Sequence, residues 1–119
     1  MIKILDIQQS ISAANGNVTL AKDLFTMLLD DLAMRQQQIS NSFNSNDMQS
    51  LGDHVHKLYG ATAYCIVPKL RTATGLLEDA LQQKDYSQLE SLVNSVLNEI
   101  KLLINDGPVL IEKEWLDFK

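Results

Sequence analysis

The chain has 119 residues, which is enough for one domain with a core of its own. Hydrophobic residues make up 45% of it and charged residues 21%, and the net charge of −5 argues against nucleic acid as a partner because phosphates attract basic surfaces. No apolar run approaches the roughly 18 residues of a membrane span, and the N-terminus lacks a signal-peptide pattern, so direct membrane contact is not expected.

The N-terminal third predicts a short helix and then a long one. The short helix starts near Asp6, a good N-cap, and fades at Asn15-Gly16. The long helix starts after Asn17, and its apolar stripe is expected to contain Leu20, Leu24, Leu28, Leu32, Ile39 and Phe43. The turn "NSNDMQ" follows, in which Asn46 or Asp47 can cap the next helix.

Three more helices are predicted. The third runs from about residue 47 to 64, with Leu51, Val55, Leu58, Thr62 and Cys65 directed inward. Pro68 is placed in the first turn of the fourth, where proline is favourable. The fourth has Val67, Leu70, Leu77 and Leu81 in its stripe, and the fifth has Leu89, Leu92, Val96, Ile100 and Leu103.

The run from Asn105 to Pro108 is a strong stop signal for the fifth helix. Residues 105–119 are therefore expected to form a C-terminal tail, amphipathic enough to add a short terminal helix. The fold predicted is all-α: an antiparallel up-down four-helix bundle with a short extra N-terminal helix, in one domain over 1–119 whose core spans about 4–104.

The stretch "HVHKLYGATAY", residues 54 to 64, contains both histidines of the chain. On a helical wheel centred on Leu51, the buried positions fall within about 40° of zero, and His56 lies near 140°, facing solvent. Gly52 and Gly60 are near 100° and 180°, and Ala63 is near 120°. A mid-helix glycine costs about 1 kcal/mol relative to alanine. Bare backbone around an exposed imidazole would leave its ring accessible to a large partner.

The other candidate groups in this stretch have simpler interpretations. His54 lies near 300° on the wheel and is expected at the core boundary, hydrogen-bonded to a neighbouring helix. Cys65, the single cysteine, points inward, and a buried thiol is usually inert packing. A metal carrier or small enzyme using His54, His56 and Cys65 stays an alternative, but a zinc site needs four ligands in recognisable pairs, and we expect none.

"HKLYG" resembles the His-x-Leu-Lys-Gly motif of histidine-containing phosphotransfer (HPt) domains. The similarity continues through a small-residue segment to "VPKL" and "LLED", and upstream to "ILD" and "GNVTLAKDLFTMLLDDL". The stretch "DHVHKLYGATAYCIVPKL" is most similar to the HPt domain of BarA-type hybrid sensor kinases. The resemblance covers roughly residues 4 to 104 and implies a four-helix bundle that transfers a phosphoryl group between receiver-domain aspartates.

Carried onto this sequence, the resemblance makes His56 the phosphorylated nucleophile and Gly60 the motif glycine. The family usually has lysine where this chain has Tyr59, and often a glycine where it has Ile66. Since a cation near the phosphoryl group would help neutralise it, Lys57, Lys69 and Arg71 are all candidates to replace the lysine.

The docking face expected around His56 contains Gly52, Asp53, Tyr59, Gly60 and Ala63. The partners implied are the receiver domains of a hybrid kinase and of a response regulator, with Mg²⁺ on the receiver and no cofactor on this chain. The glycines form no phosphate-cradling run, so no ATP site is expected. We expect a monomer in the cytoplasm. Whether it is a stand-alone carrier or the cytoplasmic C-terminal part of an inner-membrane sensor kinase stays open in the sequence, and the resemblance favours the second. The alternative function is a binding-only bundle that docks a receiver without phosphotransfer.

Overall fold

The computed structural model describes residues 6–114 except 64 and 66, and this part of the chain contains helices and no strand. The helices are α1 (Ile7–Ala13), α2 (Val18–Asn44), α3 (Met48–Ala61), α4 (Pro68–Gln82) and α5 (Leu89–Glu114). The all-α prediction, with a short helix ahead of four longer ones, is confirmed. No helix among the described residues is both long and apolar enough to span a membrane.

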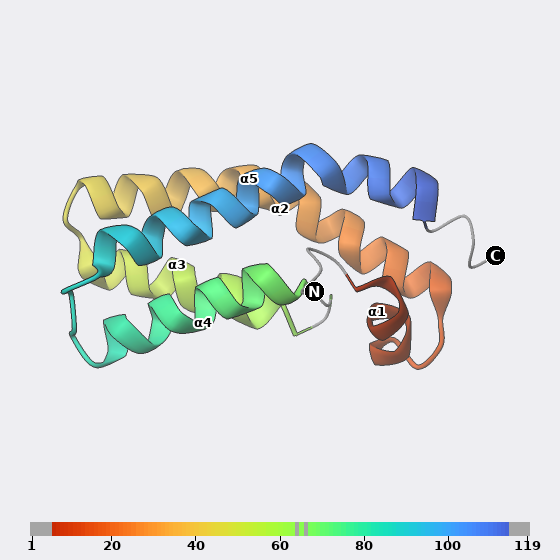
Figure 1. Cartoon of the computed structure of the whole chain (residues 1–119), viewed down its shortest axis with the longest axis horizontal. Helices are drawn as coiled ribbons and strands as arrows, with labels where there is room; N and C mark the ends of the chain where they lie inside the picture. The colour runs from red at the N-terminus through yellow and green to blue at the C-terminus, as the bar shows by residue number, and fades with distance from the viewer. Residues whose placement is uncertain (1–5, 64, 66, 115–119) are drawn as a thin grey trace.

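The four longer helices form a closed ring of neighbours. Helix α2 contacts α3, α3 contacts α4, α4 contacts α5, and α5 returns to α2. Figure 1 shows α2 and α5 side by side over most of their length, with the shorter α3 and α4 along the same side of both. Helix α1 packs against α2 beyond the ends of α3 and α4, which extends the molecule to 46 × 24 × 23 Å.

Short polar residues set the starts of the first three helices. The side chains of Asp6, Asn17 and Asp47 each accept a hydrogen bond from a backbone N–H in the first turn of the helix that follows. Pro68 occupies the first turn of α4, where its missing N–H costs nothing. The connection between α1 and α2 turns through Gly16, whose φ of +80° favours glycine.

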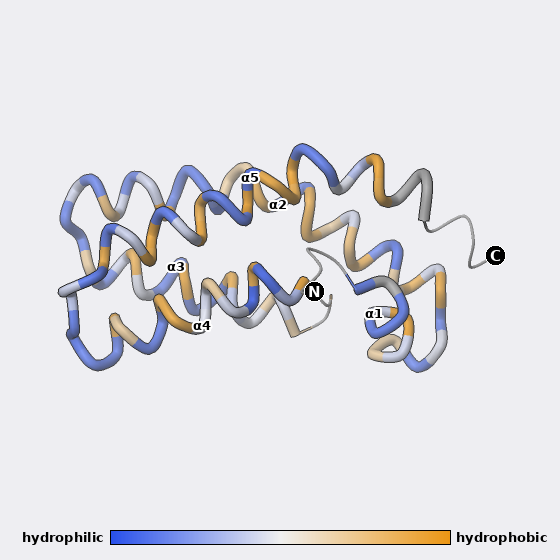
Figure 2. Tube along the Cα trace, viewed as in Figure 1, coloured by the Kyte–Doolittle hydropathy of each residue, from blue (hydrophilic) through white to orange (hydrophobic). Residues whose placement is uncertain are grey.

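The core fills the space inside the ring of helices. Figure 2 shows hydrophobic and hydrophilic residues alternating along each helix, as expected for helices buried on one side. The inward residues predicted for α3 and the α3–α4 connection are all buried, and so are Val67, Leu70 and Leu77 of the next stripe. Phe43, Leu81 and Leu92 are partly buried against this core.

The stripe predicted for α2 was wrong at its N-terminal end. Leu20 is 44% exposed and Leu24 is only partly buried, whereas Ala21 and Phe25 are fully buried. Ala21 and Phe25, each one position after a predicted leucine, continue the three-and-four spacing into Leu28 and Leu32, which are buried as predicted. The alanine was overlooked because it is weakly hydrophobic, yet its small side chain allows close helix packing.

Two helix ends also differ from the prediction. Helix α3 ends at Ala61 rather than near residue 64, which lies outside the described residues. There the Thr62 hydroxyl donates a hydrogen bond to the Tyr59 carbonyl.

The stop signal at Asn105–Pro108 does not end α5, which continues through Pro108 to Glu114. Gly107 is buried against α2, where an added Cβ would come within 2.7 Å of the Leu29 side chain. Pro108 is exposed, and Leu110 packs on the core beyond it. Tertiary packing along α2 therefore overrides the local signal, and the expected separate tail is a continuation of α5 over its described residues.

Candidate functional site

His56 is exposed on the outer side of α3 and is paired with a carboxylate from α4. Its side chain is 75% exposed, and its Nδ1 contacts Oε1 of Glu78, whose own side chain is only 13% exposed. The exposed position of His56 agrees with the helical wheel. The partner was not foreseen, because Glu78 lies 22 residues further along the chain.

The pairing with Glu78 assigns different roles to the two ring nitrogens of His56. A carboxylate only accepts hydrogen bonds, so the bonding proton belongs to Nδ1. In the neutral imidazole the lone pair is then on Nε2. Since Nδ1 is covered by Glu78 and the ring is largely exposed, Nε2 is the nitrogen that can act as a nucleophile toward a group arriving from solvent.

The antiparallel packing of α3 against α4 brings these two residues together. His56 meets Glu78, Tyr59 lies beside Gly75, and Thr62 accepts a hydrogen bond from Arg71, so each step along α3 matches a step backward along α4. Leu58 and Leu77 are fully buried on the inner sides of the two helices. The core therefore fixes the register that places Glu78 under the imidazole.

A narrow groove of about 220 Å³ lies beside the imidazole. Its lining comes from both helices and consists of Met48, Gln49, Gly52, His56, Glu78, Leu81 and Gln82. The groove lies on the α3 N-terminal side of His56, and its floor combines apolar side chains with the sheltered Glu78 carboxylate. A partner side chain entering it would contact His56 and Glu78 together.

Over the described residues, Gly52 and Gly60 show no packing role. A Cβ added at either position would meet nothing within 4 Å apart from the neighbouring residues and the backbone of its own helix turn. Gly75 is different, because its Cβ would come within 3.3 Å of the Tyr59 ring. The two glycines that flank His56 thus weaken α3 without any compensating contact, which points to a requirement outside the chain.

The remaining expected docking residues are at the surface. Asp53, Gly60 and Ala63 are exposed. Tyr59 is half-buried between α3 and α4, and Gly52 is half-buried in the lining of the groove. All five residues therefore lie where a partner covering His56 could reach them. Their part in docking stays a prediction.

The three candidate cations differ in how they are held. Lys57 and Lys69 are exposed and make no hydrogen bond or ion pair among the described residues. The guanidinium carbon of Arg71 lies 4.5 Å from the centre of the Tyr59 ring. Its Nη1 donates a 3.0 Å hydrogen bond to Thr62 Oγ1. Only Arg71 is fixed in place, and it is fixed on the residue that replaces the motif lysine. The effect of Ile66 lies outside the described residues.

His54 and Cys65 take no part in this arrangement. His54 is at the core boundary, as expected, but over the described residues it makes no hydrogen bond to a neighbouring helix, so that part of the prediction was wrong. Cys65 is buried, and desolvation raises the pKa of its thiol to about 12, so the reactive thiolate is suppressed. No three metal-ligating side chains converge within the described part of the chain.

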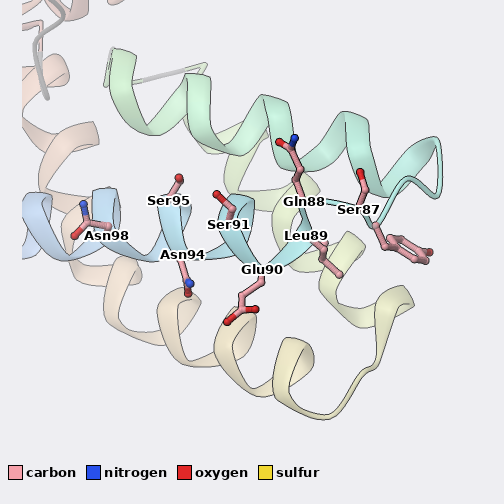
Figure 3. A pocket seen from close by; sticks show the side chains of 9 residues that line it. Ser87, Gln88, Leu89, Glu90, Ser91, Asn94, Ser95 and Asn98 are labelled. Carbon is pink, nitrogen blue, oxygen red and sulfur yellow. The ribbon is translucent and has the colours of Figure 1, made fainter.

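A larger open depression of about 970 Å³ lies along the start of α5. Figure 3 shows its lining of serine, asparagine and glutamine side chains, with Glu90 among them. None of the lining residues is a histidine, lysine, arginine or cysteine. The Ser87 hydroxyl donates a 2.7 Å hydrogen bond to the exposed Asp85 carboxylate, but no histidine orients or activates it, so this depression offers no chemistry comparable to that at His56.

Sequence reasoning missed Glu78, although the stretch "LLED" that contains it was part of the resemblance. The apolar stripe of α4 alone places Glu78 about 80° from the core direction and Asp79 about 180° from it, so only Glu78 can lie near another helix. Which residue Glu78 meets depends on the register between α3 and α4, which is set by packing across the bundle.

Comparisons with known proteins agree with this geometry. The sequence profile of the Hpt domain family matches residues 23–106. Sensor histidine kinase GacS of Pseudomonas protegens is 36% identical over 91 residues, which cover 76% of this chain and 10% of that protein. Signal transduction histidine-protein kinase BarA of Escherichia coli is 32% identical over 78 residues, which cover 66% of this chain and 8% of BarA.

A solved structure shares the fold over almost the whole chain. The crystal structure of the HPT domain from a sensor hybrid histidine kinase of Shewanella superposes with a TM-score of 0.85 at 27% sequence identity, covering 93% of this chain and 97% of that one. The chain thus aligns with about a tenth of the length of the curated relatives and with nearly all of an isolated domain.

Proposed function

We propose that this chain, which belongs to the Hpt domain family, accepts a phosphoryl group on His56 Nε2 from a receiver-domain aspartate and passes it to a response regulator. Hpt domains transfer phosphoryl groups through a histidine within two-component phosphorelays. The observation that carries the assignment to His56 is its pairing with Glu78, which leaves Nε2 as the exposed nucleophile.

The proposed step balances without a cofactor on this chain. The Nε2 lone pair attacks the phosphorus of the aspartyl phosphate, the N–P bond forms, and the P–O bond to the aspartate breaks with its electron pair leaving on the carboxylate. Positive charge develops on the imidazole as the N–P bond forms, and the Glu78 carboxylate beside Nδ1–H stabilises it. Mg²⁺ on the receiver would balance the charge of the transferring group.

The similarity to hybrid sensor kinases supports a wider proposal about context. We infer that this chain acts as the phosphotransfer segment of such a kinase, in the cytoplasm, as a monomer, with the receivers of the kinase and of a response regulator as partners. It supplies the nucleophile and a docking face, while the receiver supplies the metal and the acyl phosphate.

A phosphotransfer assay tests the proposal. A receiver carrying radiolabelled phosphate is mixed with the wild-type chain, with a His56→Gln variant and with a His54→Gln variant, which removes the other histidine of the same helix. Acid-labile, alkali-stable label is expected on the wild type and on His54→Gln, and none on His56→Gln. Label that survives in His56→Gln would overturn the site.

The binding-only alternative rests on the missing motif lysine at Tyr59. It predicts that receivers bind all three chains equally and transfer label to none. That result, obtained with several receivers that do bind, would replace phosphotransfer with docking as the function.

A further inference from the structure

Tyr59, Thr62, Gly75 and Arg71 form a small rigid cluster next to the His56 site. The Tyr59 ring packs on Gly75, where an added Cβ would approach the ring to 3.3 Å. The guanidinium of Arg71 stacks on the same ring at 4.5 Å and donates a hydrogen bond of 3.0 Å to Thr62 Oγ1. Arg71 is thereby held at two points, although it is exposed.

The fixed guanidinium has no acidic partner within the described part of the chain. Its one hydrogen bond there goes to a neutral hydroxyl, and no carboxylate lies within ion-pair distance of it. The chain as a whole carries a net charge of −5, so acidic groups are abundant elsewhere. This ordered arginine still has N–H groups available for hydrogen bonds. Its planar guanidinium is suited to bind a carboxylate of a partner protein through two parallel hydrogen bonds.

The cluster lies within reach of any protein that covers His56. Tyr59 is one turn from His56, about 5 Å along α3, and Thr62 is about 9 Å along it. A standard interface buries about 800 Å² on each partner, which corresponds to a disc of roughly 16 Å radius. A receiver that brings its aspartate to Nε2 therefore covers Tyr59 and Arg71 as well.

The surface beside the cluster also offers an apolar contact. A shallow depression of about 570 Å³ joins Tyr59 and Arg71 to Gly75 and Leu76. Leu76 is 54% exposed and presents an apolar side chain on this surface. Tyrosine and arginine are enriched among the residues that carry most of the binding energy at protein interfaces.

We propose that Arg71, stacked on Tyr59, is a docking anchor that binds a carboxylate on the contact face of the receiver, with Leu76 taking an apolar side chain beside it. This inference rests on the proposed function and names the chemistry that the partner must present. The guanidinium is tied toward Thr62, away from His56, so its partner is a surface carboxylate of the receiver and not the phosphoryl group in transit.

The test compares Arg71→Gln with Lys101→Gln, which removes the same charge from an exposed position on α5 that has no part in the site. Receiver affinity is measured by titration calorimetry for the wild type and both variants. Phosphorylation of His56 by phosphoramidate, a small donor that needs no docking face, is measured in parallel. An Arg71→Lys variant keeps the charge but loses the planar fork.

The expected result is a loss of about tenfold in receiver affinity for Arg71→Gln, the size of one charge-assisted hydrogen bond, and less than twofold for Lys101→Gln. Arg71→Lys is expected to fall between them, and phosphoramidate labelling to be equal in all four chains. Equal affinities of Arg71→Gln and Lys101→Gln would overturn the anchor while leaving phosphotransfer intact.

Two other outcomes are also decisive. Reduced phosphoramidate labelling of Arg71→Gln at unchanged receiver affinity would place Arg71 at the phosphoryl group and overturn docking. A wild-type chain that is labelled by phosphoramidate but neither binds nor accepts phosphate from any receiver would overturn the proposed function, and the anchor with it.

Discussion

The carboxylate of Glu78 is expected to accelerate transfer by stabilising the imidazole as positive charge develops. Glu78→Ala removes both the charge and the hydrogen bond to Nδ1, and we expect transfer from a phosphorylated receiver to slow by about ten- to a hundredfold, as for the loss of a charged hydrogen bond. Glu78→Gln retains an acceptor oxygen and is expected to lose less. Rapid-quench measurement of labelled His56 gives the rates.

The neighbouring residue provides the control for Glu78. Asp79 is exposed, and Asp79→Asn removes the same charge one position further along α4. Its transfer rate is expected to stay within twofold of the wild type. If Glu78→Ala and Asp79→Asn behaved alike, the pairing of Glu78 with His56 would have no chemical role.

Gly60 is expected to lower the stability of α3 and to keep the surface beside His56 open to a partner. Because an added Cβ meets no other atom within 4 Å, Gly60→Ala is expected to raise the free energy of unfolding by about 0.5–1 kcal/mol. The new methyl group would stand on the surface that the receiver approaches, so transfer is expected to slow several-fold. Urea unfolding and transfer kinetics on the same preparation measure both effects. Higher stability with unchanged transfer would mean that Gly60 serves no partner.

These residues also show what the sequence could reveal about the site. The helical wheel was sufficient to expose His56 and to bury Leu58, because those positions depend only on the period of one helix. Cys65 is buried as the wheel predicted, although it lies beyond the end of α3. Glu78 and the Tyr59–Arg71 stack depend on the register between two helices. That register is decided by the packing of the whole core and left no local trace in the sequence.

At the scale of the helix, Asp47 makes the start of α3 sensitive to acid. Its side chain accepts hydrogen bonds from the Ser50 backbone N–H and hydroxyl, and these bonds lower the pKa of the carboxyl below its usual value of 3.8. A lowered pKa in the folded state means that this stabilisation is present above the unfolded pKa and is lost as pH falls through the folded value.

Asp47→Asn isolates this contribution, since asparagine is an equally good N-cap that does not titrate. The difference in thermal unfolding midpoint between the two chains is expected to be small and constant near neutral pH. The wild type should lose stability relative to Asp47→Asn as pH falls from about 4, where Asp47 of the unfolded chain begins to be protonated, through the lower pKa of the folded chain. A difference that stays constant down to about pH 2 would contradict the cap.

At Pro108 in α5, the helix-stop signal of the local sequence conflicts with tertiary packing. Helix α5 passes through it, and Figure 1 shows α5 bent along its length, as a proline inside a helix commonly causes. Because proline removes an N–H from the helix interior, Pro108→Ala is expected to stabilise the chain by about 1–3 kcal/mol in urea unfolding. No gain would indicate that the helix stops there, as the sequence pattern suggested.

Gly107→Ala is the matched opposite of that change. Its Cβ would press on the Leu29 side chain at 2.7 Å, so this substitution should destabilise the chain although alanine favours helix.

The remaining helices were predictable to within a few residues, since their caps and three-and-four spacing are local. The end of α5 was not, because its continuation depends on α2 lying alongside.

At the scale of the whole molecule, the ring of four helices holds the site in place. Each of α2 to α5 packs on two neighbours, so α3 and α4 cannot slide against each other without disturbing the core. His56 and Arg71 lie exposed on these two helices, and the Glu78 carboxylate lies sheltered beside the imidazole. In the proposed transfer, the nucleophile would therefore be preorganised for successive partners.

The position of the phosphoryl group on the imidazole tests the central claim most directly. A ¹⁵N-labelled chain would be phosphorylated by a receiver in the presence of Mg²⁺, and its histidine ring nitrogens followed by long-range ¹H–¹⁵N NMR with ³¹P coupling. We predict coupling of phosphorus to Nε2 of His56, with Nδ1 still facing Glu78. Phosphorus on Nδ1, on His54, or on neither histidine would contradict the account.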